Sequence, residues 1–218
     1  MLLEFKNVTG VSKKYALQDI TFTLEAGYIM GLAGKNGAGK TTLFDYIMNP
    51  KQQYTGEIKI EGVNIRDNHH LMMNRIGLIS DKNTGFFAEK TAKENIELLG
   101  RFYEDWDDTV FFKAMQKMNL SVGKVVGRMS RGETLKFQTA FAMAHKPALY
   151  LIDEATAGMD PVFRIDYFKM LQEIIAEETA SILMTSHIED EIKRKMDYVG
   201  IMENGKLVEV KEADGIDV

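Results

Sequence analysis

Close to its N-terminus the chain contains the run Gly34-Lys35-Asn36-Gly37-Ala38-Gly39-Lys40-Thr41-Thr42. An apolar run at residues 28–33 precedes it and indicates a buried strand, and a helical pattern at residues 42–48 follows it. The glycines let the backbone curl so that successive N–H groups point inward, and the following helix adds its positive end. Strand, loop and helix together are the pattern of a phosphate-binding loop, in which Lys40 reaches the terminal phosphates and the Thr41 hydroxyl binds magnesium. The sequence therefore predicts a site for a nucleoside triphosphate at residues 34–42.

The overall composition fits a soluble globular protein. The 218 residues have a net charge of −5, so the sequence does not indicate a general basic surface for nucleic acid. Cysteine is absent, which excludes disulfides, thiolate metal sites and a cysteine nucleophile. The sequence has neither a signal peptide pattern nor a run of about 20 apolar residues, so we expect any membrane span to come from another chain.

Strands and helices alternate along most of the chain. The patterns predict buried strands at residues 76–80, 148–152 and 181–185, and helices at residues 130–145 and 161–178. Further strands are expected at residues 2–8, 19–25, 56–62, 198–203 and 206–210, the last two joined by an Asn204-Gly205 hairpin turn. Such alternation predicts an α/β fold with a largely parallel sheet covered on both faces.

One part of the chain interrupts this alternation. Residues 91–118 contain two successive amphipathic helical patterns, separated by an acidic link that includes Trp106. Together with the helix expected at residues 130–145, they predict a helical lobe inserted into the strand–helix chain.

Two adjacent carboxylates, Asp153 and Glu154, follow the apolar strand at residues 148–152. Ligands bind at the carboxyl ends of strands in such sheets, so we expect both acids to face the phosphates. Asp153 is then suited to hold magnesium, and Glu154 to act as general base on the attacking water. Acids that simply meet solvent are the simpler interpretation, but the phosphate loop upstream favours the functional one.

The segment Ser130-Arg131-Gly132-Glu133 opens the predicted helix at residues 130–145. Ser130 followed by Glu133 is a capping box, which satisfies backbone donors at a helix start. A capped helix start beside a glycine is also an anion site. The two interpretations are compatible, and the sequence alone does not separate them.

These motifs and their order resemble those of the ATP-binding cassette (ABC) ATPases, the nucleotide-binding subunits of ABC transporters. Residues 34–41 match the phosphate loop, residues 149–154 the Walker B strand with its catalytic glutamate, and residues 157–160 the D-loop. Residues 130–133 fall where the family has its Leu-Ser-Gly-Gly-Gln signature, which is the most specific of these motifs. The resemblance covers essentially the whole chain.

The resemblance implies both a fold and a site. The fold is a P-loop NTPase core with a mainly parallel sheet, an antiparallel β subdomain and a helical subdomain inserted at about residues 82–145, all within one domain of residues 1–218. Catalytic roles are implied for Glu154, for Lys40 and for His187, which follows a Thr-Ser pair as the switch histidine does. Implied ATP contacts come from Tyr15, which resembles the aromatic residue that stacks on adenine, and from Gly34, Lys35, Asn36, Gly37, Ala38, Gly39, Lys40, Thr41, Thr42, Ser130, Gly132, Glu133 and Asp160. The implied magnesium ligands are Thr41, Asp153 and Asp81.

The chain departs from the family pattern at four positions. Asp81 stands where the family usually has glutamine, Arg131 replaces a signature glycine, Glu133 replaces the signature glutamine, and Ala155 replaces the proline after the glutamate. We expect hydrolysis to survive because the phosphate loop, the acids and the histidine are present. Two interpretations of Arg131 stay open, a contact with phosphate and a contact with a partner subunit. The sequence indicates no catalytic or metal-binding role for His69, His70 or His145.

The family resemblance also implies a mechanism and partners. Two copies, or two related subunits, pack head to tail with ATP between the phosphate loop of one and the signature of the other. Hydrolysis to ADP and phosphate separates them, while transmembrane permease subunits dock on the helical lobe at the cytoplasmic face of the membrane. The acidic link and the Ser-Arg-Gly signature resemble exporter-type ATPases of Gram-positive bacteria, so export of a peptide, lipid or drug-like compound is expected.

Other classes of function fit less well. A soluble ABC ATPase acting on nucleic acid or ribosomes usually carries a long coiled-coil insertion or two cassettes, and the interval at residues 82–129 is short. A GTPase or small-molecule kinase would leave the signature unexplained, and the guanine motif Asn-Lys-x-Asp is absent from the sequence. A non-catalytic binding module is disfavoured because Glu154 and His187 are both present.

Overall fold

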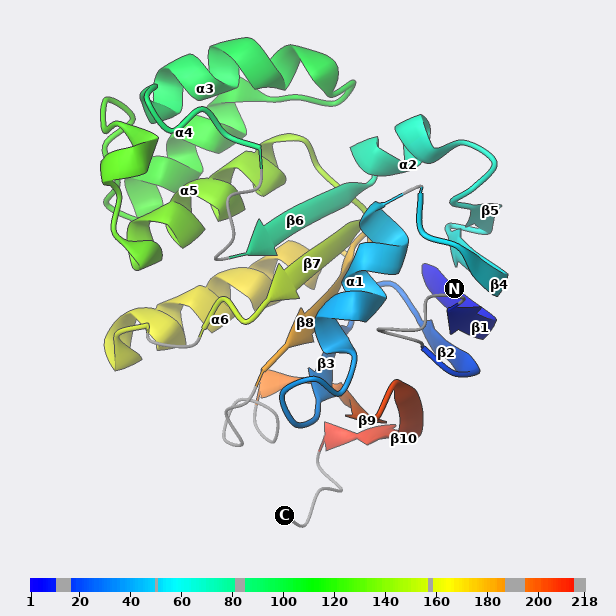
Figure 1. Ribbon diagram of the computed structural model, residues 1–218. Helices are drawn as coiled ribbons and strands as arrows, with labels where there is room; N and C mark the ends of the chain where they lie inside the picture. Colours follow the sequence, from blue (N-terminus) through cyan, green and yellow to red (C-terminus); the bar gives the residue numbers. More distant parts are fainter. Residues whose placement is uncertain (11–16, 50, 81–84, 157–158, 187–194, 214–218) are drawn as a thin grey trace.

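Two sheets organise the protein. The computed structural model describes residues 1–10, 17–49, 51–80, 85–156, 159–186 and 195–213 (Figure 1). The larger sheet has the strand order β10-β9-β3-β8-β7-β6, and its pairs are parallel except for β9 with β10. Its strands are β3 (Ile29–Ala33), β6 (Ile76–Ser80), β7 (Leu149–Asp153), β8 (Ser181–Thr185), β9 (Tyr198–Glu203) and β10 (Lys206–Glu212).

The smaller sheet is antiparallel, with the order β2-β1-β4-β5. Its strands are β1 (Leu3–Gly10), β2 (Ile20–Leu24), β4 (Tyr54–Ile60) and β5 (Val63–Asn64). Strand β2 shows the predicted alternation, with Ile20, Phe22 and Leu24 buried and the two threonines between them exposed. One apolar face of this sheet therefore packs inward, and the polar face meets solvent.

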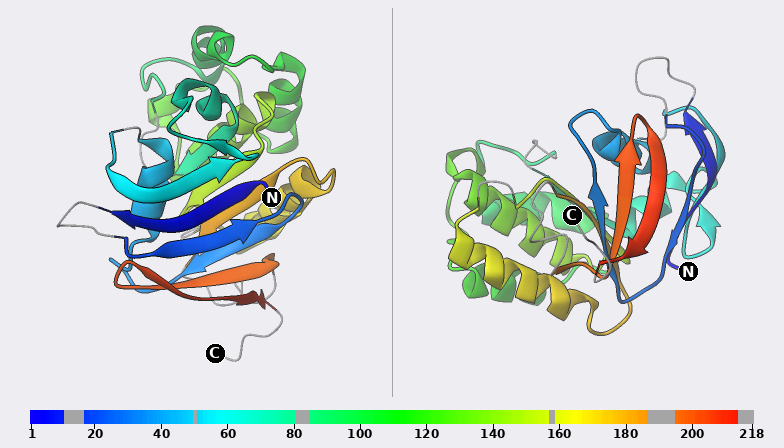
Figure 2. Two further views of the ribbon diagram at one scale, coloured as in Figure 1. Left: turned by 90° about the vertical axis from the view of Figure 1, so that its right-hand side faces the viewer. Right: turned by 90° about the horizontal axis from the view of Figure 1, so that it is seen from below.

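The helices fill the space between the sheets and cover the far side of the larger sheet. Their bounds are α1 (Lys40–Met48), α2 (His69–Asn74), α3 (Ala92–Leu99), α4 (Asp108–Lys117), α5 (Arg131–Ala144) and α6 (Pro161–Ile175), with short 3-10 turns at Gly100–Phe102 and Val126–Arg128. Helix α1 lies between the two sheets, whereas α5 and α6 lie on the other side of the larger sheet (Figures 1 and 2). Two hydrophobic clusters result, one on each side, so the larger sheet is covered on both faces as predicted.

Most predicted elements are confirmed within two or three residues at each end. Pro161 is the first residue of α6, where its fixed φ suits the helix, and Asp160 caps that helix with its side chain. The acidic link at residues 104–108 separates the helical lobe into two amphipathic parts, as expected. Helix α2 and the two-residue strand β5 were not predicted. Both are shorter than the windows in which a hydrophobic period can be recognised.

Candidate nucleotide-binding and active site

The phosphate loop connects the end of β3 with the start of α1. Gly34, Gly37 and Gly39 have φ values of 153°, 83° and 110°, which other residues rarely adopt. A Cβ at Gly34 would lie 2.4 Å from the carbonyl oxygen of Met202, so this position also needs glycine for space. The loop curls as the sequence predicted.

Lys40 is the first residue of α1, and its side chain is buried within the loop. Its Nζ donates to the carbonyl oxygens of Gly34 at 2.6 Å and Lys35 at 3.3 Å. Burial lowers the pKa of Lys40, while the nearby carboxylates of Glu154 and Asp153 act in the opposite direction. The ammonium group is therefore held close to where phosphates would enter the loop.

A cavity of about 450 Å³ opens over this loop. It is lined by Asn36, Gly37, Gly39, Lys40, Thr41, Thr42, Asp45 and Glu154. The lining includes the ammonium group of Lys40, the hydroxyls of Thr41 and Thr42 and the backbone of the loop glycines, which suit a polyanion. The carboxylate-bearing Glu154 lies at the same cavity although it is 114 residues away from Lys40 in the chain (154 − 40).

Two acids stand at the end of β7, as predicted. Asp153 is buried, and its Oδ1 accepts from the hydroxyl of Thr41 at 3.2 Å and from the hydroxyl of Thr185 at 3.0 Å. The Thr185 hydroxyl also accepts from the backbone N–H of Glu154 at 2.8 Å. One threonine at the end of β8 thus connects both acids of the site.

Glu154 adopts a left-handed backbone conformation, with φ of 49°. For a residue with a side chain this conformation costs on the order of 1 kcal/mol, and it persists where the surroundings hold it in place. The N–H bond to Thr185 is one such restraint. A second comes from Arg131, whose Nη2 donates to the Glu154 carbonyl oxygen at 3.2 Å.

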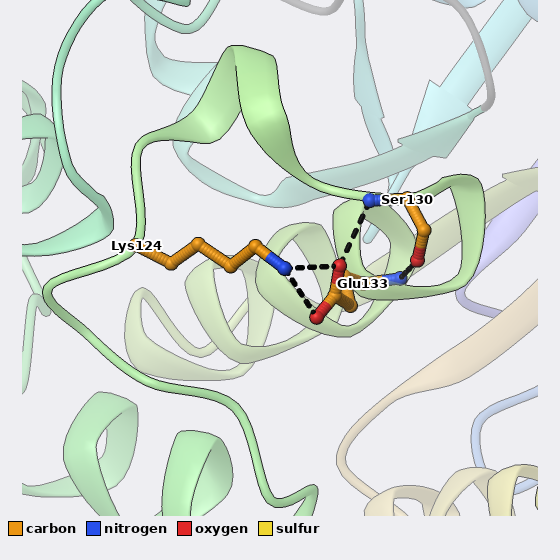
Figure 3. A network of polar contacts seen from close by, with 3 residues as sticks. All are labelled: Lys124, Ser130 and Glu133. Atoms are coloured by element: carbon orange, nitrogen blue, oxygen red, sulfur yellow. Dashed lines mark hydrogen bonds and ion pairs between the residues drawn. The ribbon is translucent and has the colours of Figure 1, made fainter.

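The segment at residues 130–133 forms the capping box at the start of α5. The Ser130 hydroxyl accepts from the N–H of Glu133 at 3.3 Å, and the Glu133 carboxylate accepts from the N–H of Ser130 at 2.8 Å. Both oxygens of Glu133 also accept from Nζ of Lys124 at 2.7 Å (Figure 3). These bonds from Lys124 and Ser130 lower the pKa of Glu133 to about 2. The carboxylate is therefore fully engaged within its own chain.

The predicted site residues fall into two separate groups. Most of the phosphate loop and Glu154 line the cavity, and Asp153 is bonded to Thr41 beside it. The lining residues do not include Gly34, Lys35 or Ala38 of the loop, nor Ser130, Gly132 or Glu133 of the signature. Asp160 accepts from two backbone N–H groups of α6 with its side chain, so its contact with ATP stays a prediction. Tyr15, Asp81 and His187 lie outside the described residues, and their roles stay predictions as well.

Two contributors to these groups were missed from the sequence. Thr185 has a recognisable signal, because it ends the strand beside β7 and pairs in register with Asp153. Lys124 has no such signal, since it lies in an irregular segment between α4 and α5. Among the other histidines, His145 is buried, and its two ring nitrogens lie within hydrogen-bond distance of the carbonyl oxygens of Phe141 and Ile76. His70 is exposed, whereas His69 is half-buried.

Among the described residues, no cluster of three or more His, Asp or Glu side chains could hold a metal alone. Within the same residues, no helix is both long and apolar enough to cross a membrane. The fold and the cavity define a P-loop nucleotide-binding protein with acids at the end of the neighbouring strand.

Comparisons with known proteins identify the family. Residues 17–157 match the family model of the ABC transporter. The ABC transporter ATP-binding protein YtrB of Bacillus subtilis (strain 168) is 30% identical over 214 residues, which cover 98% of this chain and 73% of that protein. The bacitracin transport ATP-binding protein BcrA of Bacillus licheniformis is 31% identical over 207 residues, covering 92% of this chain and 67% of that protein.

A solved ATP-binding subunit of an ABC transporter has the same fold, with a TM-score of 0.88 at 25% identity over 98% of this chain and 91% of that one. The chain therefore belongs to the ABC transporter family and has the ABC ATPase fold. It is an ATP-binding and ATP-hydrolysing subunit of an ABC transporter. The expectation from the motifs is confirmed, and the alternative of an ATPase acting on nucleic acid or ribosomes is not favoured.

Proposed function

We propose that this chain binds ATP in the cavity of about 450 Å³ and that a second ATP-binding subunit completes the site. The observation that carries the proposal is the lining of this cavity, which includes the phosphate loop and Glu154 but neither Ser130 nor Gly132. Within the described part of the chain, the donors that line the cavity come from the phosphate loop and the start of α1. The capped start of α5 from a second subunit, with its backbone N–H groups, supplies donors for the other side.

Magnesium fits the same cavity. The hydroxyl oxygen of Thr41 and Oδ1 of Asp153 lie 3.2 Å apart, and both are the hard oxygen donors that magnesium prefers. The two residues would hold the ion together with phosphate oxygens, and Asp81 is proposed as a third contributor. When bound, magnesium would neutralise charge on the phosphates.

Hydrolysis requires an activated water and stabilisation of the phosphate charge. We assign the first task to Glu154, which lines the cavity and is a carboxylate suited to act as general base. Lys40 provides positive charge from its buried position. His187 is proposed to contact the terminal phosphate, Asp160 to act near the subunit boundary, and Tyr15 to stack on adenine.

We propose that ATP hydrolysis by this chain powers export through separate transmembrane permease subunits. The chain would bind these subunits at the cytoplasmic face of the membrane. ATP binding brings the two ATP-binding subunits together and hydrolysis lets them separate, so the nucleotide selects between two states. The similarity to BcrA, a bacitracin transport ATP-binding protein, supports a peptide or drug-like compound as cargo. The helical lobe formed by α3, α4 and α5 is the proposed docking surface for the permeases.

Replacement of Glu154 by glutamine tests this function. The Glu154→Gln variant is expected to bind ATP within a fewfold of the unchanged protein, to hydrolyse it about 100-fold more slowly or worse, and to dimerise in ATP. Glu89→Gln, which alters an exposed carboxylate, is the matched control and is expected to leave turnover unchanged. If Glu154→Gln hydrolysed ATP as fast as the unchanged protein, Glu154 would not be the general base. A strictly monomeric state of Glu154→Gln at high protein and ATP concentration, also with its permeases present, would contradict the two-subunit site.

A further inference from the structure

Arg131 connects two motifs within one chain. It is the first residue of α5, directly after the capping Ser130, and its guanidinium donates to the main-chain carbonyl of Glu154 at 3.2 Å. Its own side chain is largely exposed at the start of the helix. The signature segment and the proposed catalytic glutamate are thus in direct contact, although they are proposed to serve different ATP molecules.

This contact completes the restraint on the Glu154 backbone. The left-handed conformation of Glu154 is one that its surroundings must maintain. The Thr185 hydroxyl holds the N–H side of Glu154, and Arg131 holds its carbonyl side. The two peptide planes on either side of the Glu154 Cα are therefore fixed in orientation. This also fixes the direction in which the Glu154 side chain points from the backbone.

The arginine is not explained by the needs of its own helix. A positive charge in the first turn of a helix opposes the helix dipole, so Arg131 does not stabilise the start of α5. The capping there is provided by Ser130 and Glu133. A hydrogen bond of the Arg131 side chain leads out of α5, to the Glu154 carbonyl at the end of β7.

We propose that Arg131 is a positioning residue for Glu154 and that it couples the two nucleotide sites of the assembled pair. The proposal rests on the proposed function, because it takes Glu154 as the general base and Ser130 as a contact to the nucleotide of the other subunit. When the start of α5 closes on that nucleotide, Arg131 moves with it and adjusts the carbonyl of Glu154 in its own site. Hydrolysis at one site then depends on closure at the other.

The test separates positioning from direct contact with phosphate. In the Arg131→Ala variant we expect kcat to fall by about three- to tenfold, with KM and the ATP affinity of the isolated chain within about twofold, because one charge-assisted hydrogen bond at an exposed position is lost. Arg131→Gln keeps a donor without the charge and is expected to recover part of kcat. The control Arg128→Ala removes an exposed arginine close to Ser130 and is expected to leave kcat unchanged.

A second measurement uses the Glu154→Gln background, in which ATP-driven dimerisation is recorded without hydrolysis. Arg131→Ala in this background is expected to dimerise with the same ATP dependence. A dimerisation constant weakened tenfold or more would assign Arg131 to the phosphates of the other nucleotide and overturn the proposal, as would an unchanged kcat in Arg131→Ala. Failure of the proposed function is recognised separately, because Glu154→Gln would then retain turnover.

Discussion

The two segments that we propose to contact nucleotide are built by opposite means. The phosphate loop is a recessed backbone curl with a buried ammonium, and it lines a cavity of about 450 Å³. The signature segment at residues 130–133 is an exposed helix start whose side chains are already bonded to one another and to Lys124. The first segment can enclose phosphates within one chain. The second offers donors but no enclosure, so it can contribute to nucleotide binding only when another surface packs against it.

This difference predicts that substitutions beside the two segments have different consequences. A change beside the phosphate loop acts on the chemistry within one chain, because the groups there are buried and interconnected. A change beside the signature acts on a partly exposed network, in which water can replace lost partners at a smaller cost. Three substitutions test this contrast.

The largest effect is expected for Thr185→Val, which removes the hydroxyl that connects Asp153 with the N–H of Glu154. Valine has the same shape, so the buried position stays filled while the donor of Glu154 and one oxygen of Asp153 lose a partner. We expect a loss of about 1–3 kcal/mol in the free energy of unfolding and a roughly tenfold lower kcat, measured by denaturant titration and steady-state ATPase assays.

Thr139→Val is the matched control for this change. Its hydroxyl is equally buried, but it donates to the Leu135 carbonyl within α5 and lies near the Tyr167 hydroxyl, away from the cavity. We expect this variant to lose stability without losing kcat in the same proportion. If Thr185→Val kept full turnover, the idea that this hydroxyl orders the acids would be wrong.

The second-largest effect is expected for a substitution of His145, which lies at the C-terminal end of α5, opposite the signature segment. Its ring lies between the carbonyl oxygens of Phe141 at 3.2 Å and Ile76 at 3.1 Å, and it stacks on Tyr103. Burial lowers the pKa of His145, while the two carbonyl contacts act in the opposite direction. The folded protein therefore favours the neutral ring more than the unfolded chain does.

The pH dependence follows from this shift. Below the unfolded pKa, near 6.5, the unfolded chain gains a proton that the folded protein resists, so stability is full above this pH and falls as the pH drops towards the folded pKa. Each pKa unit of difference corresponds to about 1.4 kcal/mol once the loss is complete. We expect His145→Gln to fold at pH 7.5 and to lose less stability than the unchanged protein between pH 7.5 and pH 5. Parallel stability curves for the two proteins would contradict this.

The sequence predicted the phosphate loop and also the capping box at residues 130–133, whereas it missed the contacts that join either segment to distant parts of the chain. The loop, its strand and its helix are neighbours in the chain, and the acids end an apolar strand whose place in a parallel sheet follows from topology. Contacts between distant segments were not available from local patterns. Thr185 meets Asp153 through the register of β7 and β8, and Arg131 meets Glu154 because α5 packs beside the end of β7. Lys124 reaches Glu133 from an irregular segment, for which no periodicity exists.

The smallest effect is expected for Lys124→Ala, which removes one partner from the partly exposed network at the signature. The side chains of Lys124 and Glu133 are only about one-third exposed, 35% and 30%, and we expect the loss of their ion pair to cost about 0.5–1 kcal/mol in the free energy of unfolding. Glu133→Gln provides the complementary change, since glutamine at this position still closes the capping box with Ser130. The double variant then gives the coupling energy of the pair, measured by denaturant titration. If Lys124→Ala instead lowered kcat as much as Thr185→Val does, the signature would be as tightly coupled to chemistry as the phosphate loop, and the contrast between the two segments would fail.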